Sequence, residues 1–321
     1  MGAGEPVAVR PREATVRRVD FGGVALFDDV GGTLEATVRG RLMGKRKALG
    51  NAVVVGDRVT LEWEADRAAI DAVAPRRSAF SRRAAGERVE EQVIAANLDL
   101  VVIVASLHRP DFKHGLVDRV LAQARSASVP ALLALNKTDL GNAEETAALL
   151  ADYAPAGVEG IATCGITGLG VDALREACRG RRALFVGHSG VGKSTLLGHL
   201  APGHELLLGD VNELTGKGRH TTTAALLLRP EPGLELIDTP GVRAFGLWGI
   251  DADNLAGHYP EISPHLGTCR FGDCRHDREP GCGLHAALER GDIPARRWES
   301  FLRLREELAE EQRQRPRYGA R

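Results

Sequence analysis

The sequence predicts an α/β phosphate-loop domain that is flanked by a small OB-type β-barrel on its N-terminal side and by a metal-binding, mainly helical domain on its C-terminal side. Three observations support this prediction. Residues 187–194 fit the pattern G-x-x-x-x-G-K-[ST] without a mismatch. Short apolar runs separated by glycines fill the N-terminal part of the chain. Three cysteines and one histidine cluster between Cys269 and Cys282.

Length, charge and apolar content restrict the class of protein that this chain can be. With 321 residues and 43% hydrophobic residues, the chain is long enough for two or three folded domains. The formal net charge is −1, so a polyanionic partner has to meet local basic patches. No apolar run approaches the roughly 20 residues of a membrane span, and the first residues lack the apolar core of a signal peptide. We therefore expect a cytoplasmic protein with no membrane contact.

The N-terminal domain, assigned to residues 1–85 with its linker, is expected to be a five-stranded barrel. Between about residues 15 and 74, short apolar or alternating runs have the spacing of a small barrel. The OB fold is favoured, and an SH3-like barrel is the alternative. Residues 75–86 are basic and rich in turn formers, which predicts the linker. The apolar runs cover residues 23–27, 35–39, 51–55 and 57–63.

A basic loop in this domain suits contact with RNA phosphates. Residues 39–47 carry five positive charges and no acidic residue. The alternative is an ordinary solvated hairpin tip. Aromatic residues are scarce here, whereas proteins that bind single strands usually stack bases on several rings. Any RNA binding by this domain should therefore depend on charge and shape.

The central domain, assigned to residues 86–246, is expected to contain a parallel sheet. Apolar strands alternate with helical stretches, an order that favours parallel strands covered by helices on both faces. Strands are predicted at 98–105, 130–135, 160–163, 182–186, 224–228 and 234–238, and helices at 114–126, 144–153 and 195–200.

A base-recognition motif follows the second of these strands. Asn136-Lys137-Thr138-Asp139 resembles the guanine-specificity motif of GTPases and lies at the carboxyl end of a strand, where α/β sheets place ligands. The Asp139 carboxylate can accept both the N1–H and the N2–H of guanine, and the stem of Lys137 can lie over the base. Adenine does not present this pair of donors, so an ATPase is the weaker option.

Residues 164–170 resemble the fifth GTPase motif. Cys164-Gly165 stands where Ser-Ala is usual, a mild departure because the base contact there comes largely from backbone N–H groups. This departure leaves the role of the Cys164 side chain open, and a small buried thiol is the favoured interpretation.

The phosphate loop lies between a predicted strand and a predicted helix, which is the context that the motif requires. Backbone N–H groups at the helix N-terminus would surround the phosphates, Lys193 would reach the β- and γ-oxygens, and the Ser194 hydroxyl would ligate Mg²⁺. The residues assigned to this site are Gly187, His188, Ser189, Gly190, Val191, Gly192, Lys193, Ser194 and Thr195.

Two further segments complete a nucleotide site. Asp238-Thr239-Pro240-Gly241 resembles the third GTPase motif, in which the Asp238 carboxylate holds Mg²⁺ through water and the Gly241 N–H meets the γ-phosphate. The threonines at 221–223 resemble the first switch. Thr222 is favoured as the Mg²⁺ ligand, with Thr221 and Thr223 as alternatives.

The order of these motifs is unusual, because the base motif precedes the phosphate loop. A circular permutation explains it, provided that the original termini lie close in space. The residue that senses the γ-phosphate, Gly241, then leads directly toward the C-terminal domain.

The C-terminal domain, assigned to residues 247–321, is expected to hold one structural Zn²⁺. The spacing C-x₄-C-x-H-x₅-C supplies a closed Cys₃His set, and a disulfide with a spare thiol is the alternative. His265 and His285 flank the set and are interpreted as ordinary residues. A helix is predicted at 293–314, followed by a basic tail that either is solvated or contacts phosphates. The assigned zinc ligands are Cys269, Cys274, His276 and Cys282, and the apolar helix positions are Trp298, Phe301, Leu302 and Leu308.

The permuted motif order, the OB-type barrel and the Cys₃His spacing together resemble the ribosome small-subunit-dependent GTPase A family, also called RsgA or YjeQ. The resemblance covers nearly the whole chain. It implies a GTPase that binds the 30S subunit late in assembly, contacts 16S rRNA, is stimulated by the subunit and leaves after hydrolysis. A monomer is expected. The rival interpretations are a permuted GTPase that acts on another ribosomal particle and a nucleotide-gated RNA-binding module with incidental hydrolysis.

The catalytic step lacks its usual water-positioning group. Val242 stands where Ras-like enzymes place a glutamine, so intrinsic turnover should be slow. His220, beside the switch threonines, is the nearby side chain able to orient that water, and a purely structural role is the alternative. The assigned catalytic residues are Lys193, His220 and Thr222.

Overall fold

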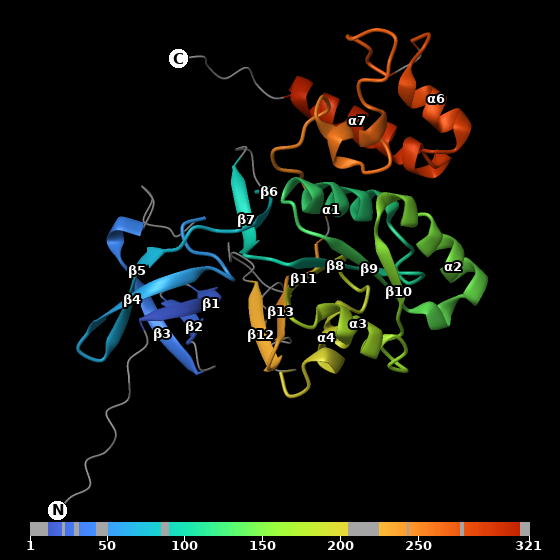
Figure 1. The fold of residues 1–321 in the computed structure, drawn as a ribbon. Helices are drawn as coiled ribbons and strands as arrows, with labels where there is room; N and C mark the ends of the chain where they lie inside the picture. Colours follow the sequence, from blue (N-terminus) through green and yellow to red (C-terminus); the bar gives the residue numbers. More distant parts are fainter. Residues whose placement is uncertain are drawn as a thin grey trace, which may run out of the picture.

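The structure is a computed structural model that describes residues 12–20, 23–28, 32–42, 51–84, 90–204, 225–242, 244–276 and 279–314. Three modules are visible in Figure 1: a barrel on the left, a sheet with helices on both faces in the middle, and a helical module above it. Across these described ranges, no helix has the length and apolar character needed to cross a membrane.

The first module is a closed barrel with strand order β1-β2-β3-β5-β4. β1 pairs with β4 to close it, and β3 and β5 are the parallel pair. This five-stranded topology confirms the predicted OB-type barrel. Its interior holds alternate side chains of the strands, such as Val59 and Leu61 of β4. The strands are β1 Glu13–Asp20, β2 Gly23–Phe27, β3 Thr33–Val38, β4 Arg58–Glu64 and β5 Arg67–Val73.

Two details of the barrel differ from the sequence prediction. Residues 51–55 were expected to form a strand but contain only an isolated bridge from Val55 to Ala95. The backbone turns there because the buried Asp57 carboxylate accepts the N–H of Val54 at 2.9 Å and holds Arg76. β1 and β5 were not expected, because arginines and small alanines obscure their alternation.

The predicted linker at 75–86 contains a strand. β6, Ala79–Arg83, pairs antiparallel with β7, Glu91–Ala96. The Phe80 ring is completely buried and lies 5.6 Å from the Phe245 ring, centroid to centroid. The Arg83 N–H donates to the Gly246 carbonyl at 2.9 Å. The segment therefore packs on the chain that leaves the central sheet, a long-range contact that turn composition does not reveal.

The central sheet has the order β10-β9-β8-β11-β13-β12. All neighbours are parallel except the edge strand β12, which pairs antiparallel with β13. Every residue of the central β8 is buried, as expected for a strand covered on both faces. The strands are β8 Leu100–Ser106, β9 Ala131–Asn136, β10 Glu159–Ala162, β11 Arg181–Gly187, β12 Leu226–Glu231 and β13 Leu234–Asp238.

Four helices cover this sheet. Residues of α1 pack with one face of β8, whereas residues of α3 and α4 pack with the other face. The predicted α1 has the expected bounds. The helix α3 was not predicted, because it directly follows residues 164–170, which have the composition of a loop. The helices are α1 His114–Ser126, α2 Ala143–Ala151, α3 Val171–Cys178 and α4 Lys193–Leu200.

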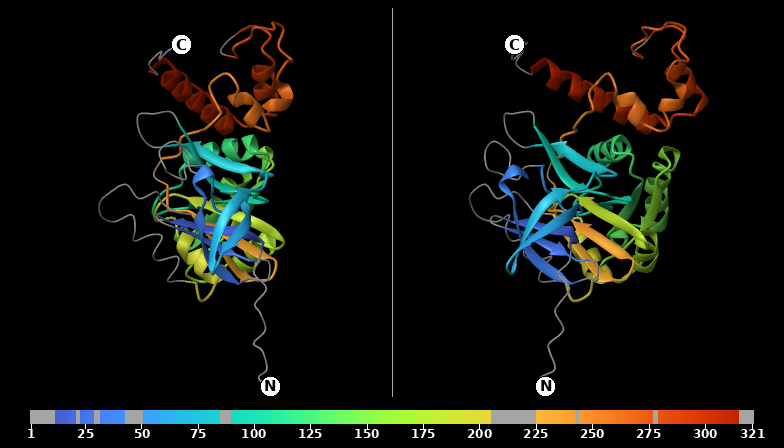
Figure 2. Two further views of the ribbon diagram at one scale, coloured as in Figure 1. Left: turned by 90° about the vertical axis from the view of Figure 1, so that its left-hand side faces the viewer. Right: turned by 60° about the vertical axis from the view of Figure 1, so that its left-hand side comes forward.

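The C-terminal module lies against α1, on the same side of the sheet in all views of Figures 1 and 2. On α7, Trp298, Phe301, Leu304 and Leu308 are buried, whereas Leu302 is only partly buried. Leu304 was missing from the expected apolar set. The elements are the short 3₁₀ helices η4 Leu255–His258 and η5 Ser263–His265, and the α-helices α6 Gly283–Arg290 and α7 Ala295–Gln314.

Arginine contacts join the barrel to the side of the central sheet that β11, β13 and β12 form. The guanidinium groups of Arg17 and Arg229 each lie over the Phe27 ring, 5.0 and 4.8 Å from its centroid. Arg182 donates to the Gly56 carbonyl at 2.7 Å, and Glu235 pairs with both Arg182 and Arg229. Burial alone would raise the pKa of Glu235, but the two arginines outweigh it and hold that pKa below the usual value.

Candidate nucleotide site and metal centre

The phosphate loop connects β11 to α4 and requires its glycines. A Cβ on Gly192, whose φ is 88°, would lie 2.3 Å from the side-chain nitrogen of Asn136. A Cβ on Gly187 would lie 2.5 Å from the Val104 carbonyl oxygen. The loop therefore sits tightly against two neighbouring strands and directs the first N–H groups of α4 outward, which is the arrangement that binds phosphate.

Lys193 and Asp238 meet at the centre of the site. The ammonium group of Lys193 pairs with Oδ1 of Asp238, and both side chains are buried. Burial raises the pKa of Asp238, and Lys193 opposes that rise. Oδ2 of Asp238 is buried and has no hydrogen-bond partner among the described residues. A bound dication with its waters would satisfy this oxygen, so the donor set fits Mg²⁺.

The segment after β13 lies directly on the phosphate loop. A Cβ on Gly241 would come within 2.9 Å of the Ser189 Cα, so only glycine fits here. The Val242 N–H donates to the Gly187 carbonyl at 3.0 Å, and Val242 bridges to His188. Any γ-phosphate in the loop would therefore lie next to the backbone of Gly241.

Asn136 fastens the base motif to the phosphate loop. Its side-chain nitrogen donates to the Val191 carbonyl at 2.9 Å, and its oxygen accepts the Gly165 N–H at 3.0 Å. The Thr163 hydroxyl also donates to this oxygen at 3.3 Å. Asn136 is only 1% exposed, so its amide is satisfied as a buried polar group should be. These bonds fix the positions of the base motif, the fifth motif and the phosphate loop relative to one another.

Lys137 lies over the phosphate loop. Its ammonium group donates to the Gly190 carbonyl at 2.6 Å and to the Arg109 carbonyl. Its backbone is left-handed, with φ at 60°, which turns the side chain away from the direction of β9. The aliphatic stem thus extends from the base motif to the phosphate loop.

Asp139 has a partner that the sequence did not predict. The buried Cys164 thiol donates to Oδ1 of Asp139 at 3.1 Å. The expectation of a small buried thiol is confirmed, because Cys164 is 1% exposed. A carboxylate oxygen keeps a second lone pair after accepting one bond, so Asp139 retains the capacity to accept two guanine N–H groups. His199 supports the same loop, because its Nε2 lies 2.7 Å from the Gly165 carbonyl oxygen.

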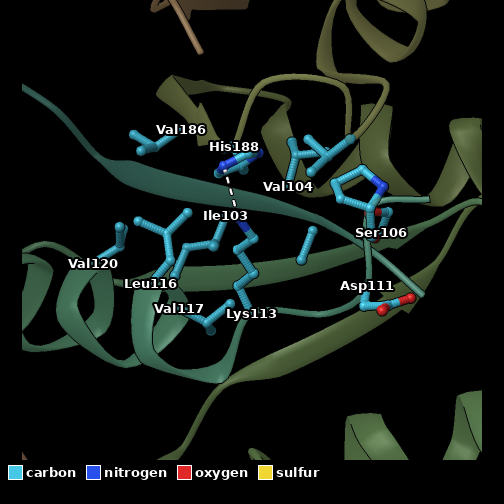
Figure 3. A pocket seen from close by; sticks show the side chains of 14 residues that line it. Ile103, Val104, Ser106, Asp111, Lys113, Leu116, Val117, Val120, Val186 and His188 are labelled. Carbon is cyan, nitrogen blue, oxygen red and sulfur yellow. Dashed lines mark hydrogen bonds between the residues drawn. The ribbon is translucent and has the colours of Figure 1, made fainter. Parts of the chain in front are cut away.

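A lysine from outside the motifs contacts the phosphate loop. Nζ of Lys113 lies 2.9 Å from Nε2 of His188, as the dashed line in Figure 3 shows. Nδ1 of His188 lies 2.7 Å from the Ser189 carbonyl oxygen, so Nδ1 carries the proton and Nε2 accepts from Lys113. The cavity beside this pair is lined largely by apolar side chains. Its volume of about 10 Å³ is too small for a nucleotide.

Several predicted site residues lie outside the described ranges. They are His220 and the threonines at 221–223, together with residues 43–47 of the basic loop and residues 315–321 of the tail. Thr195 lies within the described ranges, near the start of α4. A Cβ on Gly165 would lie 2.9 Å from the Thr195 methyl carbon, so the threonine limits the space there.

The four predicted zinc ligands converge. One ligand atom from each of Cys269, Cys274, His276 and Cys282 lies within 4.8 Å of the others. The His276 Nδ1 is 3.5 Å from the sulfur atoms of Cys269 and Cys282. A Cys₃His set at this separation fits a structural Zn²⁺. Of the flanking histidines, His285 packs on the Trp298 ring at 5.5 Å.

The chemistry of the thiols also fits a dication. Burial raises the pKa of Cys269, but the N–H of Gly283, 3.3 Å from its sulfur, and neighbouring donors outweigh this and lower that pKa. Desolvation and the adjoining thiols raise the pKa of Cys274 to about 12. A bound dication would stabilise the thiols together as thiolates.

Comparison with known proteins identifies relatives of this chain. The sequence model of the RsgA GTPase family matches residues 73–248. A protein of Gemmatimonas aurantiaca named small ribosomal subunit biogenesis GTPase RsgA is 42% identical over 292 residues, which cover 89% of this chain and 94% of that relative. A protein of the same name from Hahella chejuensis is 42% identical over 267 residues, covering 81% of this chain and 75% of the relative.

Solved structures have the same fold. YjeQ from Thermotoga maritima matches with a TM-score of 0.74 and 26% identity, over 93% of this chain and 98% of that one. YloQ, described as a circularly permuted GTPase, matches with a TM-score of 0.70 and 22% identity, over 98% of this chain and all of that one. The permuted fold and the family resemblance that the sequence predicts are both confirmed. The chain belongs to the RsgA GTPase family.

Proposed function

We propose that this GTPase binds the small (30S) ribosomal subunit late in its assembly and converts GTP to GDP and phosphate faster when the subunit is bound. The observation that carries the proposal is the meeting of the phosphate loop, the guanine motif and Asp238 at one edge of a permuted sheet. Relatives that are named small ribosomal subunit biogenesis GTPases support the choice of partner.

The nucleotide contacts follow from the geometry. Residues 187–195 would surround the phosphates, with Lys193 released from Asp238 to reach the β- and γ-oxygens. Ser194 and Asp238, together with Thr222, would hold Mg²⁺, which neutralises charge on the phosphates when it is bound. The close fit of Gly241 against Ser189 supports a γ-phosphate sensor at this position.

The base would bind beside the stem of Lys137. Asn136 fixes the frame, the loop at Cys164 and Gly165 closes the pocket, and Asp139 selects guanine by accepting two N–H groups. GTP and GDP are therefore the substrate and the product.

For hydrolysis, we propose that His220 orients the attacking water, because Val242 occupies the place of the usual glutamine. His220→Ala should abolish subunit-stimulated hydrolysis while GTP binding persists. Intact stimulated hydrolysis in this variant would contradict the assignment and leave His220 a structural role.

The partner surfaces would be the barrel and the zinc module, both contacting 16S rRNA. Arginines and lysines at 39–47 supply charge for phosphate contacts. One structural Zn²⁺, held by the Cys₃His set, would keep the C-terminal module folded. A protein that serves the subunit acts where subunits are assembled, so we propose the cytoplasm, with no membrane contact and a monomeric state.

The deciding experiment compares GTP hydrolysis by the full-length protein alone, with purified 30S subunits and with purified 50S subunits. Lys193→Ala, which removes the phosphate-binding ammonium group, is the control for contaminating hydrolases. We expect selective stimulation by 30S. Equal or greater stimulation by 50S would assign the enzyme to another particle. No stimulation by either, with RNA binding that still depends on the nucleotide, would favour a nucleotide-gated binding module.

A further inference from the structure

An aromatic ring is exposed on the loop that carries the zinc ligands. Phe271 is 48% exposed. The other large hydrophobic side chains that are exposed in the described ranges are aliphatic. It lies between Cys269 and Cys274, two of the residues that could hold the metal.

The backbone under this ring is fixed from both sides. The Cys274 N–H donates to the Phe271 carbonyl at 3.3 Å, which closes a turn between two metal ligands. The Arg270 N–H donates to the Gly281 carbonyl at 2.9 Å, next to the third cysteine. Gly281 has a φ of 76°, and a Cβ there would lie 2.9 Å from the Cβ of Arg270. A bound metal would make this loop a rigid support for the ring.

Two arginines lie near the ring, in a loop that also carries acidic residues. The Arg270 guanidinium lies over the Phe271 ring, 5.5 Å from its centroid. Arg275 is also exposed, and its carbonyl accepts from Arg305 at 2.7 Å. Within the described part of the module, neither Arg270 nor Arg275 has a carboxylate at ion-pair distance from its guanidinium. Both charges are thus available to a phosphate backbone.

We propose that Phe271 is a stacking platform for an unpaired base of ribosomal RNA, with Arg270 and Arg275 binding the adjoining phosphates. This inference rests on the proposed function, because it names the RNA contact of the zinc module. An unpaired base is flat on both faces and stacks on an aromatic ring whatever its identity, whereas paired RNA offers no free face. The barrel, which is poor in aromatic residues, would add charge but little stacking.

A protein partner fits this surface less well. The core of a protein interface is depleted of charge and joins several apolar side chains. The residues beside Phe271 are Arg270 on one side and Gly272 and Asp273 on the other. An isolated ring among charged residues matches the combination of stacking and phosphate contact that single-stranded RNA needs.

The test measures binding of the zinc-loaded full-length protein to a short, unstructured oligouridylate and to a duplex RNA by fluorescence anisotropy. Phe271→Ala should weaken oligouridylate binding roughly tenfold, equivalent to about 1.4 kcal/mol. Phe271→Trp should retain it, and the duplex affinity should not change in either variant. Leu266→Ala, which removes another exposed hydrophobic side chain from the same module, is the matched control and should bind like the wild type. Zinc content, measured for each variant, shows that the module is folded.

Three results would overturn the proposal. Unchanged oligouridylate affinity in zinc-loaded Phe271→Ala would show that the ring does not stack on a base. An equal loss for the duplex would show that charge or shape, not stacking, is affected. Weaker 30S binding with unchanged oligouridylate binding would place the ring on a ribosomal protein. Selective stimulation of the wild-type GTPase by 30S is measured separately, so a failure of the proposed function remains distinguishable from a failure of this inference.

Discussion

Replacing Arg297 by methionine should release the C-terminal module from α1 while the central sheet stays folded. Arg297 is 1% exposed, and its guanidinium bonds Asp118 of α1 and Glu261 of the C-terminal module. The rings of Tyr259 and Tyr153 lie 4.7 and 5.4 Å from its central carbon. Burial alone would lower the pKa of Arg297, but the two carboxylates outweigh it and raise that pKa. The cation therefore joins two modules.

The expected loss is about 3–5 kcal/mol of docking free energy. Methionine fills part of the volume but leaves the Asp118 and Glu261 carboxylates, at most 1% exposed, without their cation. Two charge-assisted bonds at about 1.5–3 kcal/mol each sum to about 3–6 kcal/mol, which overlaps the roughly 3–5 kcal/mol cost of breaking a buried pair. Arg296, whose Nη1 is 3.8 Å from Asp118, remains and keeps the loss toward the lower end.

Hydrogen exchange of α7 amides in the full-length protein measures this local opening directly. Arg290→Met removes an exposed arginine that pairs with Asp292, and it should cost less than about 1 kcal/mol. Replacing Asp118 by Leu and Glu261 by Met in the Arg297→Met background should recover much of the loss, because no buried charge is then unpaired. A loss below about 1 kcal/mol in Arg297→Met alone would refute the reasoning.

Four further predictions follow from the site and its support. Asp139→Asn should shift nucleotide preference from guanine toward xanthine, because a hydrogen-bond donor replaces an acceptor. Competition binding with GTP and XTP measures this preference, and an unchanged preference would contradict the assignment of Asp139 to the base. Cys164→Ala should weaken GTP binding several-fold, whereas Cys164→Ser, which keeps a donor to Asp139, should not; equal effects would assign the loss to packing. Chelation of zinc, or Cys282→Ser, should unfold the C-terminal module and abolish oligouridylate binding, while the central domain still binds GTP. Loss of both oligouridylate and GTP binding would show that the modules do not fold separately. Burial and Arg296 lower the pKa of His114, so the unfolded state takes up a proton first as the pH falls through about 6.5. Stability should accordingly decrease below that pH, and His114→Gln should flatten this part of a series of urea midpoints.

The nucleotide motifs could be predicted because each is short, contiguous and tied to one chemical task. Gly187 to Ser194 needs no knowledge of the rest of the chain, and the buried runs before it and before Asn136 showed where parallel strands end. The contacts that support these motifs were not predictable in the same way. Cys164 and Asp139 are 25 positions apart, and Arg297 and Asp118 are 179 positions apart. Residue type alone does not specify which distant side chain becomes the partner.

Local patterns also failed where tertiary contacts override them. Residues 51–55 have strong strand propensity, yet Asp57 turns their backbone into a loop. The segment around Phe80 has the composition of a linker, yet its ring is buried against Phe245. In both places, one long-range or buried contact outweighs the propensity of the surrounding residues.

The position of β8 in the sheet has a consequence for synthesis of the chain. This strand is central and wholly buried, but its neighbour β11 begins about 75 residues after β8 ends, a delay of roughly 4–15 s at the usual rates of translation. During that interval β9 covers one edge of β8, and the other edge presents unpaired N–H and carbonyl groups of an apolar strand. We therefore expect nascent chains that end before Arg181 to bind chaperones and to aggregate when released, and chains that include β11 to resist both, which pull-down of stalled chains of the two lengths would test.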